Sequence, residues 1–244
     1  MARKMKYEIG PEKLLQAVHD MYARAHDVCD ILDVETEGCV VRGNGKCISS
    51  DSEDLVASFL YANLKNRIPN LYIMVNPNVR RKDGAERTRS VCPDVLISIK
   101  RSETEYDALY VLELKQNTGW MRGESRFRDC AEKLERNLEW LKRRVCNFKL
   151  DDFSGIERNV WFPQSLRYDI ALLADVNDCE ENMADYGRII QSDYRGRFKM
   201  VAFSHGALYN KSNPQYVPDP NDESFDYIIS RILDAWDAFR KKHR

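Results

Sequence analysis

Apolar residues recur every three or four positions in four stretches of the chain, the spacing of helices that bury one face. The first stretch covers residues 11–32 and begins at Pro11, a residue that the first turn of a helix tolerates. The second begins near residue 51, the third covers residues 124–144, and the last follows residue 222. This pattern predicts four amphipathic helices, with one at each end of the chain.

Shorter apolar runs lie between the second helix and the last, and their length and β-branched content are typical of strands. The predicted strands are residues 71–79, 91–99, 107–115, 168–176 and 198–205. A basic turn around Asp83-Gly84 is expected to join the first two as a hairpin. Helices that flank a run of strands predict an α/β fold, with a mixed central sheet sandwiched by helices.

The length of 244 residues suits one domain that buries about 70% of its unfolded surface. We expect a single domain over residues 1–244, with its core at about 51–176. Residues 1–50 would form an N-terminal helical extension, and residues 177–244 would complete the domain with a strand and a helix.

The net charge of −1 excludes a protein that is basic throughout, so contacts with nucleic acid would depend on local patches. The seven cysteines include no CxxC pair, which argues against a zinc knuckle or a disulfide framework. We identify no run that resembles a signal peptide or reaches membrane-spanning length. A cytoplasmic protein is expected.

The two strands around loop 100–107 carry three charged residues at one end. In the simplest hairpin register Asp94 faces Glu113, and opposed side chains lie about 5 Å apart. Because strand side chains alternate, Lys115 shares the face of Glu113. Two carboxylates so close repel each other, and a divalent cation between them would remove the penalty. The hairpin therefore predicts a metal site with an ammonium beside it.

The sequence Pro93-Asp94, followed after eighteen residues by Glu113-Leu114-Lys115, resembles the motif of the PD-(D/E)XK nuclease superfamily. The resemblance implies the restriction-endonuclease-like fold, whose core has the order α-β-β-β-α-β. Residues 51–176, about half of the chain, supply predicted elements in that order.

The resemblance also implies roles for the residues of the motif. Asp94, Glu113 and the backbone carbonyl of Leu114 would hold Mg²⁺, for which Mn²⁺ could substitute. Lys115 would orient or deprotonate the attacking water. Mg²⁺ prefers oxygen ligands and keeps several waters, so two carboxylates and a carbonyl suit it.

Glu53 has two interpretations. Ser50 and Glu53 match a capping box, in which Glu53 would bond back to the Ser50 amide. Glu53 also lies three and seven residues before Val56 and Leu60, on the inward face of the same helix. Many members of the superfamily have an acid on the first core helix that reaches the metal, and Glu53 best matches that catalytic and metal-binding role.

Basic residues crowd the first hairpin turn and the start of the third helix, and a strand-end amide follows the motif. Each could be an ordinary solvated side chain, or could contact the phosphates of a nucleic acid. The candidate nucleic-acid contacts are Arg80, Arg81, Lys82, Arg87, Arg89, Arg122, Arg126 and Gln116.

The leading functional hypothesis is a Mg²⁺-dependent phosphodiesterase, an endonuclease acting on DNA in restriction, repair or antiphage defence. The alternative is a catalytically inactive module of the same fold that binds nucleic acid or protein. A third hypothesis is an assembly protein in which Lys115 forms a lone salt bridge with one acid. A homodimer is left open.

Overall fold

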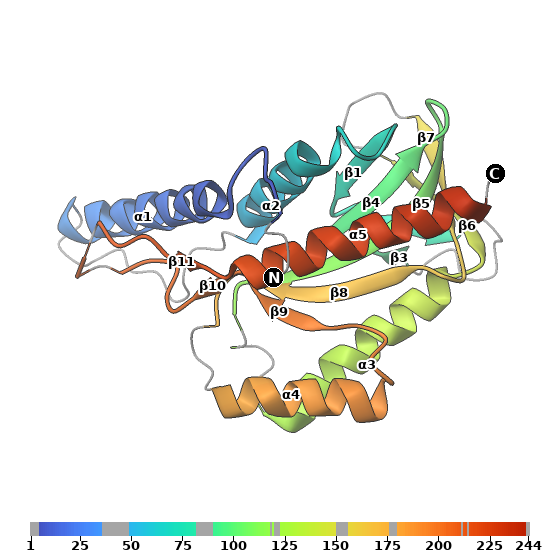
Figure 1. Cartoon of the computed structure of the whole chain (residues 1–244). Coiled ribbons are helices and arrows are strands. Elements are labelled where there is room, and N and C mark those ends of the chain that lie inside the picture. Colours follow the sequence, from blue (N-terminus) through green and yellow to red (C-terminus); the bar gives the residue numbers. More distant parts are fainter. Residues whose placement is uncertain are drawn as a thin grey trace.

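The structure is a computed structural model, and it describes residues 5–35, 49–81, 90–117, 119, 123–149, 156–175, 180–210, 212–213 and 215–242. A mixed central sheet lies between helices (Figure 1), which confirms the predicted α/β class. The helices are α1 (Pro11–Glu35), α2 (Ser49–Leu64), α3 (Glu124–Leu141), α4 (Glu180–Asp193) and α5 (Asp222–Lys242). In the described part of the chain, no helix is both long and apolar enough to cross a membrane.

Within the described residues, the main sheet has nine strands, and two further short strands pair with each other. The strands of the main sheet are β1 (Leu71–Val75), β2 (Val79–Arg81), β3 (Ser90–Val91), β4 (Val95–Lys100), β5 (Glu105–Lys115), β6 (Arg144–Lys149), β7 (Glu157–Phe162), β8 (Arg167–Leu172) and β9 (Met200–Ala202). The small sheet consists of β10 (Ser204–His205) and β11 (Asp219–Pro220).

The helices form two layers, one on each face of the sheet. Apolar residues of α1, α2 and α5 share one core with the sheet, and Phe59 of α2 contacts Phe225 of α5 at 5.2 Å between ring centroids. Residues of α3 and α4 share a second core, in which Phe127 stacks on Tyr186 at 4.6 Å. Figure 1 shows α5 crossing the front of the sheet, with α3 and α4 together below it.

The first hairpin is broken in its middle. β1 pairs with β4 and β2 pairs with β3, and both pairings follow one register, which places Pro77 opposite Pro93. Proline has no N–H to donate, and a proline pair interrupts a ladder on both strands. Asn76 adopts a left-handed backbone at this point (φ 48°). The continuous strands expected at 71–79 and 91–99 are therefore wrong, although the hairpin is present.

The longest strand, β5, organises the rest of the sheet. It runs antiparallel to β4, and its two halves run parallel to β7 and β8 respectively. The predicted register is confirmed at the inner end, where Val95 pairs with Leu112 and Leu96 with Val111. It shifts between Ile97 and Ser98 through an irregularity that the sequence pattern did not indicate.

Other expected boundaries differ from the structure. The helix expected to reach residue 144 ends at Leu141, because Arg143 takes a left-handed backbone (φ 59°). The strand predicted at 168–176 is β8, which ends at Leu172. The strand expected at 198–205 is divided between β9 and β10, which belong to different sheets. The apolar periodicity of the sequence did not indicate β6, β7 or α4.

Candidate functional site

Three oxygen atoms converge on the ammonium of Lys115 at the end of β5. Lys115 Nζ lies 2.6 Å from Glu113 Oε1 and 3.1 Å from Asp94 Oδ2. It also lies 3.1 Å from the backbone oxygen of Leu114. The structure therefore brings Asp94, Glu113 and Leu114, three of the predicted metal ligands, together around the positive charge of Lys115.

The broken hairpin fixes the position of Asp94. Asp94 follows Pro93 and precedes β4, so it lies where the ladder is interrupted. Its backbone oxygen accepts a hydrogen bond from the Asn76 amide (3.0 Å), and its Oδ2 accepts one from the Leu114 amide (2.7 Å). Backbone contacts from both neighbouring strands thus hold the carboxylate beside Glu113.

Burial and the neighbouring charges act in opposite directions on this cluster. Burial raises the pKa of Glu113, and Asp94 adds to the rise, while Lys115 opposes it. Burial disfavours the charged Lys115, but Glu113 and Asp94 outweigh that effect and raise its pKa. The lysine is consequently held as a cation, and it offsets part of the repulsion between the two carboxylates.

Glu53 comes to the same region from α2. The helix begins at Ser49, so Ser50 already lies in its first turn, and the Glu53 carboxylate accepts a hydrogen bond from the side-chain amide of Asn76. Glu53 is only 7% exposed. Burial raises its pKa, and the nearby charge of Asp94 raises it further. This contact differs from the capping interpretation and directs the carboxylate toward Asp94.

Asn76 was missed by the sequence analysis. Its side-chain amide bonds to Glu53 and its backbone amide bonds to Asp94, so one residue links the two acids. Asparagine adopts the left-handed backbone more readily than most residues do. The Asn-Pro pair at 76–77 is a turn signal that could have suggested the break in the strand, but not the contact with Glu53.

A pocket of about 390 Å³ opens beside the charged cluster, between the sheet and α3. Glu113 and Lys115 line it from the sheet, and Lys133 and Asn137 line it from the helix. Lys133 was also missed, although its position next to the apolar stripe of α3 was visible in the helical period. The pocket gives the cluster an open side with a second cation near it.

The candidate nucleic-acid contacts have different surroundings. Arg81 stacks on Trp140, with its Cζ 5.5 Å from the ring centroid, which gives it a packing contact. Arg80 and Arg126 are exposed, and Gln116 is half-buried just beyond β5. Lys82, Arg87, Arg89 and Arg122, like the turn at Asp83-Gly84, lie outside the described residues.

The donor set consists of oxygen atoms, which suit a hard cation, but it contains few side-chain ligands. Among the described residues, no three His, Cys, Asp or Glu side chains gather closely enough to hold a metal. Asp94, Glu113 and the Leu114 carbonyl nevertheless supply three oxygens around one point, and Mg²⁺ commonly completes a small protein donor set with water. These residues fit Mg²⁺ provided that the Lys115 ammonium moves aside.

Comparison with protein-family models, curated proteins and solved structures gives no match to this chain. A functional conclusion therefore depends on the geometry of its own residues.

Proposed function

We propose that the protein is a Mg²⁺-dependent nuclease that hydrolyses phosphodiester bonds, with DNA as its substrate. The observation that carries the proposal is the convergence of Asp94, Glu113 and the Leu114 carbonyl on the Lys115 ammonium. Two carboxylates held together in a half-buried position destabilise a fold unless a cation lies between them. A cation site that opens into a pocket is the arrangement a metal-dependent hydrolase requires.

The order of the elements supports the same proposal. α2, β1, β4, β5, α3 and β8 follow one another along the chain, with additional strands inserted between them. β1, β4 and β5 are antiparallel neighbours, and β8 runs parallel to β5 on its other side. Apart from the inserted strands, this order is compatible with the α-β-β-β-α-β core that the resemblance to restriction endonucleases implies, and it supports the proposal.

Each residue of the cluster has a role that its contacts suggest. Asp94, Glu113 and the Leu114 carbonyl would hold Mg²⁺, which when bound would acidify water and neutralise charge on the phosphodiester. Lys115, released from the carboxylates, would donate a hydrogen bond to the attacking water or to a phosphate oxygen. Glu53, oriented by Asn76, would accept a hydrogen bond from a water at the same site.

A binding module without catalytic activity is the second candidate. It is favoured by the ammonium of Lys115, which already contacts both carboxylates and could stabilise them permanently. In that case the pocket and the exposed Arg80 and Arg126 would serve recognition alone.

Cleavage assays on single-stranded and double-stranded DNA, with Mg²⁺ or with EDTA, test the proposal. Asp94→Asn should reduce cleavage by about 100-fold or more, because a metal ion contributes several kcal/mol to such reactions. Asp237→Asn is the matched control, since Asp237 pairs with Arg240 on α5, at 2.8 Å. Mg²⁺ binding without cleavage would favour the binding module, and cleavage that Asp94→Asn leaves intact would refute the proposal.

A further inference from the structure

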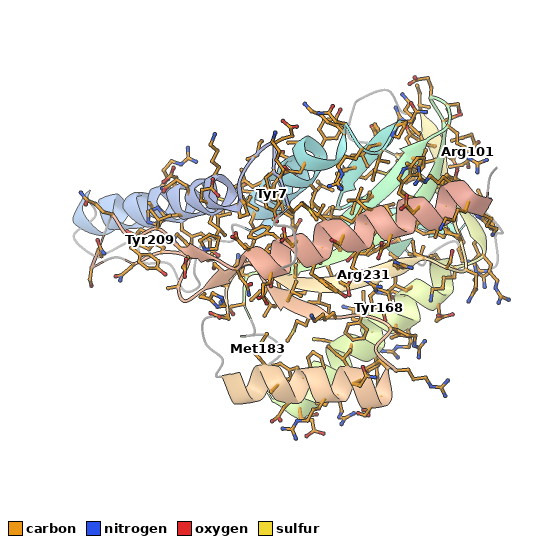
Figure 2. All side chains as sticks on the ribbon, in the orientation of Figure 1. Tyr7, Arg101, Tyr168, Met183, Tyr209 and Arg231 are labelled. Carbon is orange, nitrogen blue, oxygen red and sulfur yellow. The ribbon has the colours of Figure 1, made fainter. Side chains whose placement is uncertain are left out.

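A second pocket, of about 480 Å³, lies at the outer side of β9 between α4 and α5. β9 pairs with β8, and among the described residues it has no strand on its other side. Met183 of α4 and Arg231 of α5 both line the pocket (Figure 2). Met200 of β9 pairs with Ile170, which pairs with Glu113, so two strand spacings of about 10 Å in total separate this pocket from the candidate metal site.

The pocket carries positive charge. Lys199 Nζ lies 4.6 Å from the centroid of the Tyr227 ring, and Arg231 Cζ lies 5.9 Å from the same centroid. The described residues that line the pocket include no Asp or Glu. Nor does any described carboxylate lie within salt-bridge distance of Lys199. An anion that enters would meet an uncompensated ammonium.

Asp169 holds the wall of this pocket in place from within the sheet. Its fully buried carboxylate accepts hydrogen bonds from the Tyr110 hydroxyl (2.5 Å) and the Lys199 backbone amide (2.5 Å). It also accepts them from the Tyr227 hydroxyl and from Arg231 Nε, both at 3.3 Å. Because Arg231 uses Nε here, and no described residue accepts from its terminal nitrogens, those nitrogens stay available for a ligand.

Gly187 is an independent sign that the space is kept open. It lies inside α4, where glycine is among the weakest helix formers. A Cβ added at Gly187 would have nothing within 4 Å. Met183, Ile190 and Gln191, which lie three or four residues from Gly187, line the pocket as well. The face of α4 that turns to the pocket therefore lacks a side chain at its centre.

We propose that this pocket binds a free mononucleotide or a phosphorylated molecule of similar size with one flat ring. Guanidinium and ammonium groups bind phosphoryl oxygens, and the guanidinium can do so through two parallel hydrogen bonds. Lys199 and Arg231 would hold the phosphoryl group, and the ring would lie along Met183 and Ile190. The volume falls within the range of about 300–1,000 Å³ found for small-molecule sites.

Calorimetric titration with AMP in EDTA tests this site without engaging the candidate metal site. Lys199→Met should weaken AMP binding by about 10-fold or more, because it removes the free ammonium. It should leave the fold intact, because Asp169 bonds to the backbone of Lys199 and not to its side chain. Lys65→Met is the matched control: Lys65 also lies over a tyrosine ring, that of Tyr61 at 6.0 Å, but outside this pocket.

A second pair of variants tests occupancy of the space. Gly187→Leu should weaken AMP binding because its side chain would occupy part of the pocket beside α4, whereas Gly187→Ala should bind nearly as the parent does. Both replacements favour the helix, so α4 should persist. Thermal melting of each variant in EDTA checks the fold.

Several results would overturn the proposal. The proposal is wrong if AMP does not bind the parent, or if adenosine binds as tightly as AMP. It is also wrong if Lys199→Met or Gly187→Leu leaves the affinity for AMP unchanged. Inorganic phosphate that binds as tightly as AMP would remove the ring from the proposal. A short oligodeoxyadenylate that binds more tightly than AMP, and through Lys199, would replace the free mononucleotide with a nucleic-acid strand.

Discussion

Replacing Lys115 by methionine should have opposite effects with and without a divalent cation. Methionine keeps most of the aliphatic length but cannot compensate Asp94 and Glu113. Both side chains are largely buried, with 15% and 24% of their surfaces exposed, so water replaces the ammonium poorly. The variant should be less stable than the parent when metal is absent.

The size of the effect follows from the lost contacts. A hydrogen bond that involves a charged group contributes about 1.5–3 kcal/mol, and the variant loses three of them, two to the carboxylates and one to the Leu114 carbonyl. The net loss is smaller than their sum, because the groups are partly exposed and the carboxylates can take up protons. We expect a net loss of about 2 kcal/mol at neutral pH in EDTA. For a chain of this size, that loss corresponds to a fall in Tm of about 4–8 °C.

The Lys115→Met variant should bind a divalent cation more tightly than the parent does. In the parent, Mn²⁺ must displace the ammonium from three oxygens, whereas in Lys115→Met those oxygens are free. We expect Mn²⁺ to bind the variant about 10-fold more tightly, which is about 1.4 kcal/mol, and to raise its Tm by more than it raises the parent's. Cleavage should be lost even though the metal binds.

Thermal melting and calorimetric titration with Mn²⁺ measure these effects, and Lys133→Met is the control. Lys133 lines the same pocket, but it is exposed and forms no salt bridge with a described residue. That variant should melt close to the parent in EDTA. The reasoning is refuted if Lys115→Met is as stable as the parent without metal, or if its affinity for Mn²⁺ falls.

Two further predictions concern the acid on α2 and its partner. Burial, together with the charge of Asp94, raises the pKa of Glu53 in the folded protein, so folding favours the protonated carboxyl. The stability that this preference contributes is fully present below the ordinary pKa of 4.5, and it is lost as the pH rises through the folded pKa. Glu53→Gln in EDTA should therefore melt at or above the parent's Tm at neutral pH, with the difference vanishing in acid. A lower Tm at neutral pH would instead show that the carboxylate charge stabilises the fold, because glutamine can still complete a capping box. Asn76→Gly should tolerate the φ of 48° and keep the amide bond to Asp94, whereas Asn76→Ala should be about 1 kcal/mol less stable than the glycine variant. Urea unfolding of the two variants measures this difference, and equal stability would exclude strain at this turn.

The sequence by itself determined the local features of this protein. Helical periodicity predicted α1, α3 and α5, because a helix with one buried face repeats its apolar residues locally. The simplest hairpin register predicted the pairing of β4 with β5 at the inner end, and with it the approach of Asp94 to Glu113, although the pairs next to the loop are offset by one residue through the irregularity between Ile97 and Ser98. Alternation along β5 then placed Lys115 beside them, so the core of the candidate site could be read from one stretch of the chain.

Only the tertiary structure decided what depends on contacts between distant segments. Each proline of the broken hairpin is visible in the sequence, but the opposition of Pro77 and Pro93 depends on the register of two strands. The link from Asn76 to Glu53 requires α2 to pack at the end of β1. The pocket at Lys199 and Arg231 is assembled from β9, α4 and α5 around a buried Asp169. The local periodicity of the sequence does not predict such contacts, because they depend on packing between elements that lie far apart in the chain.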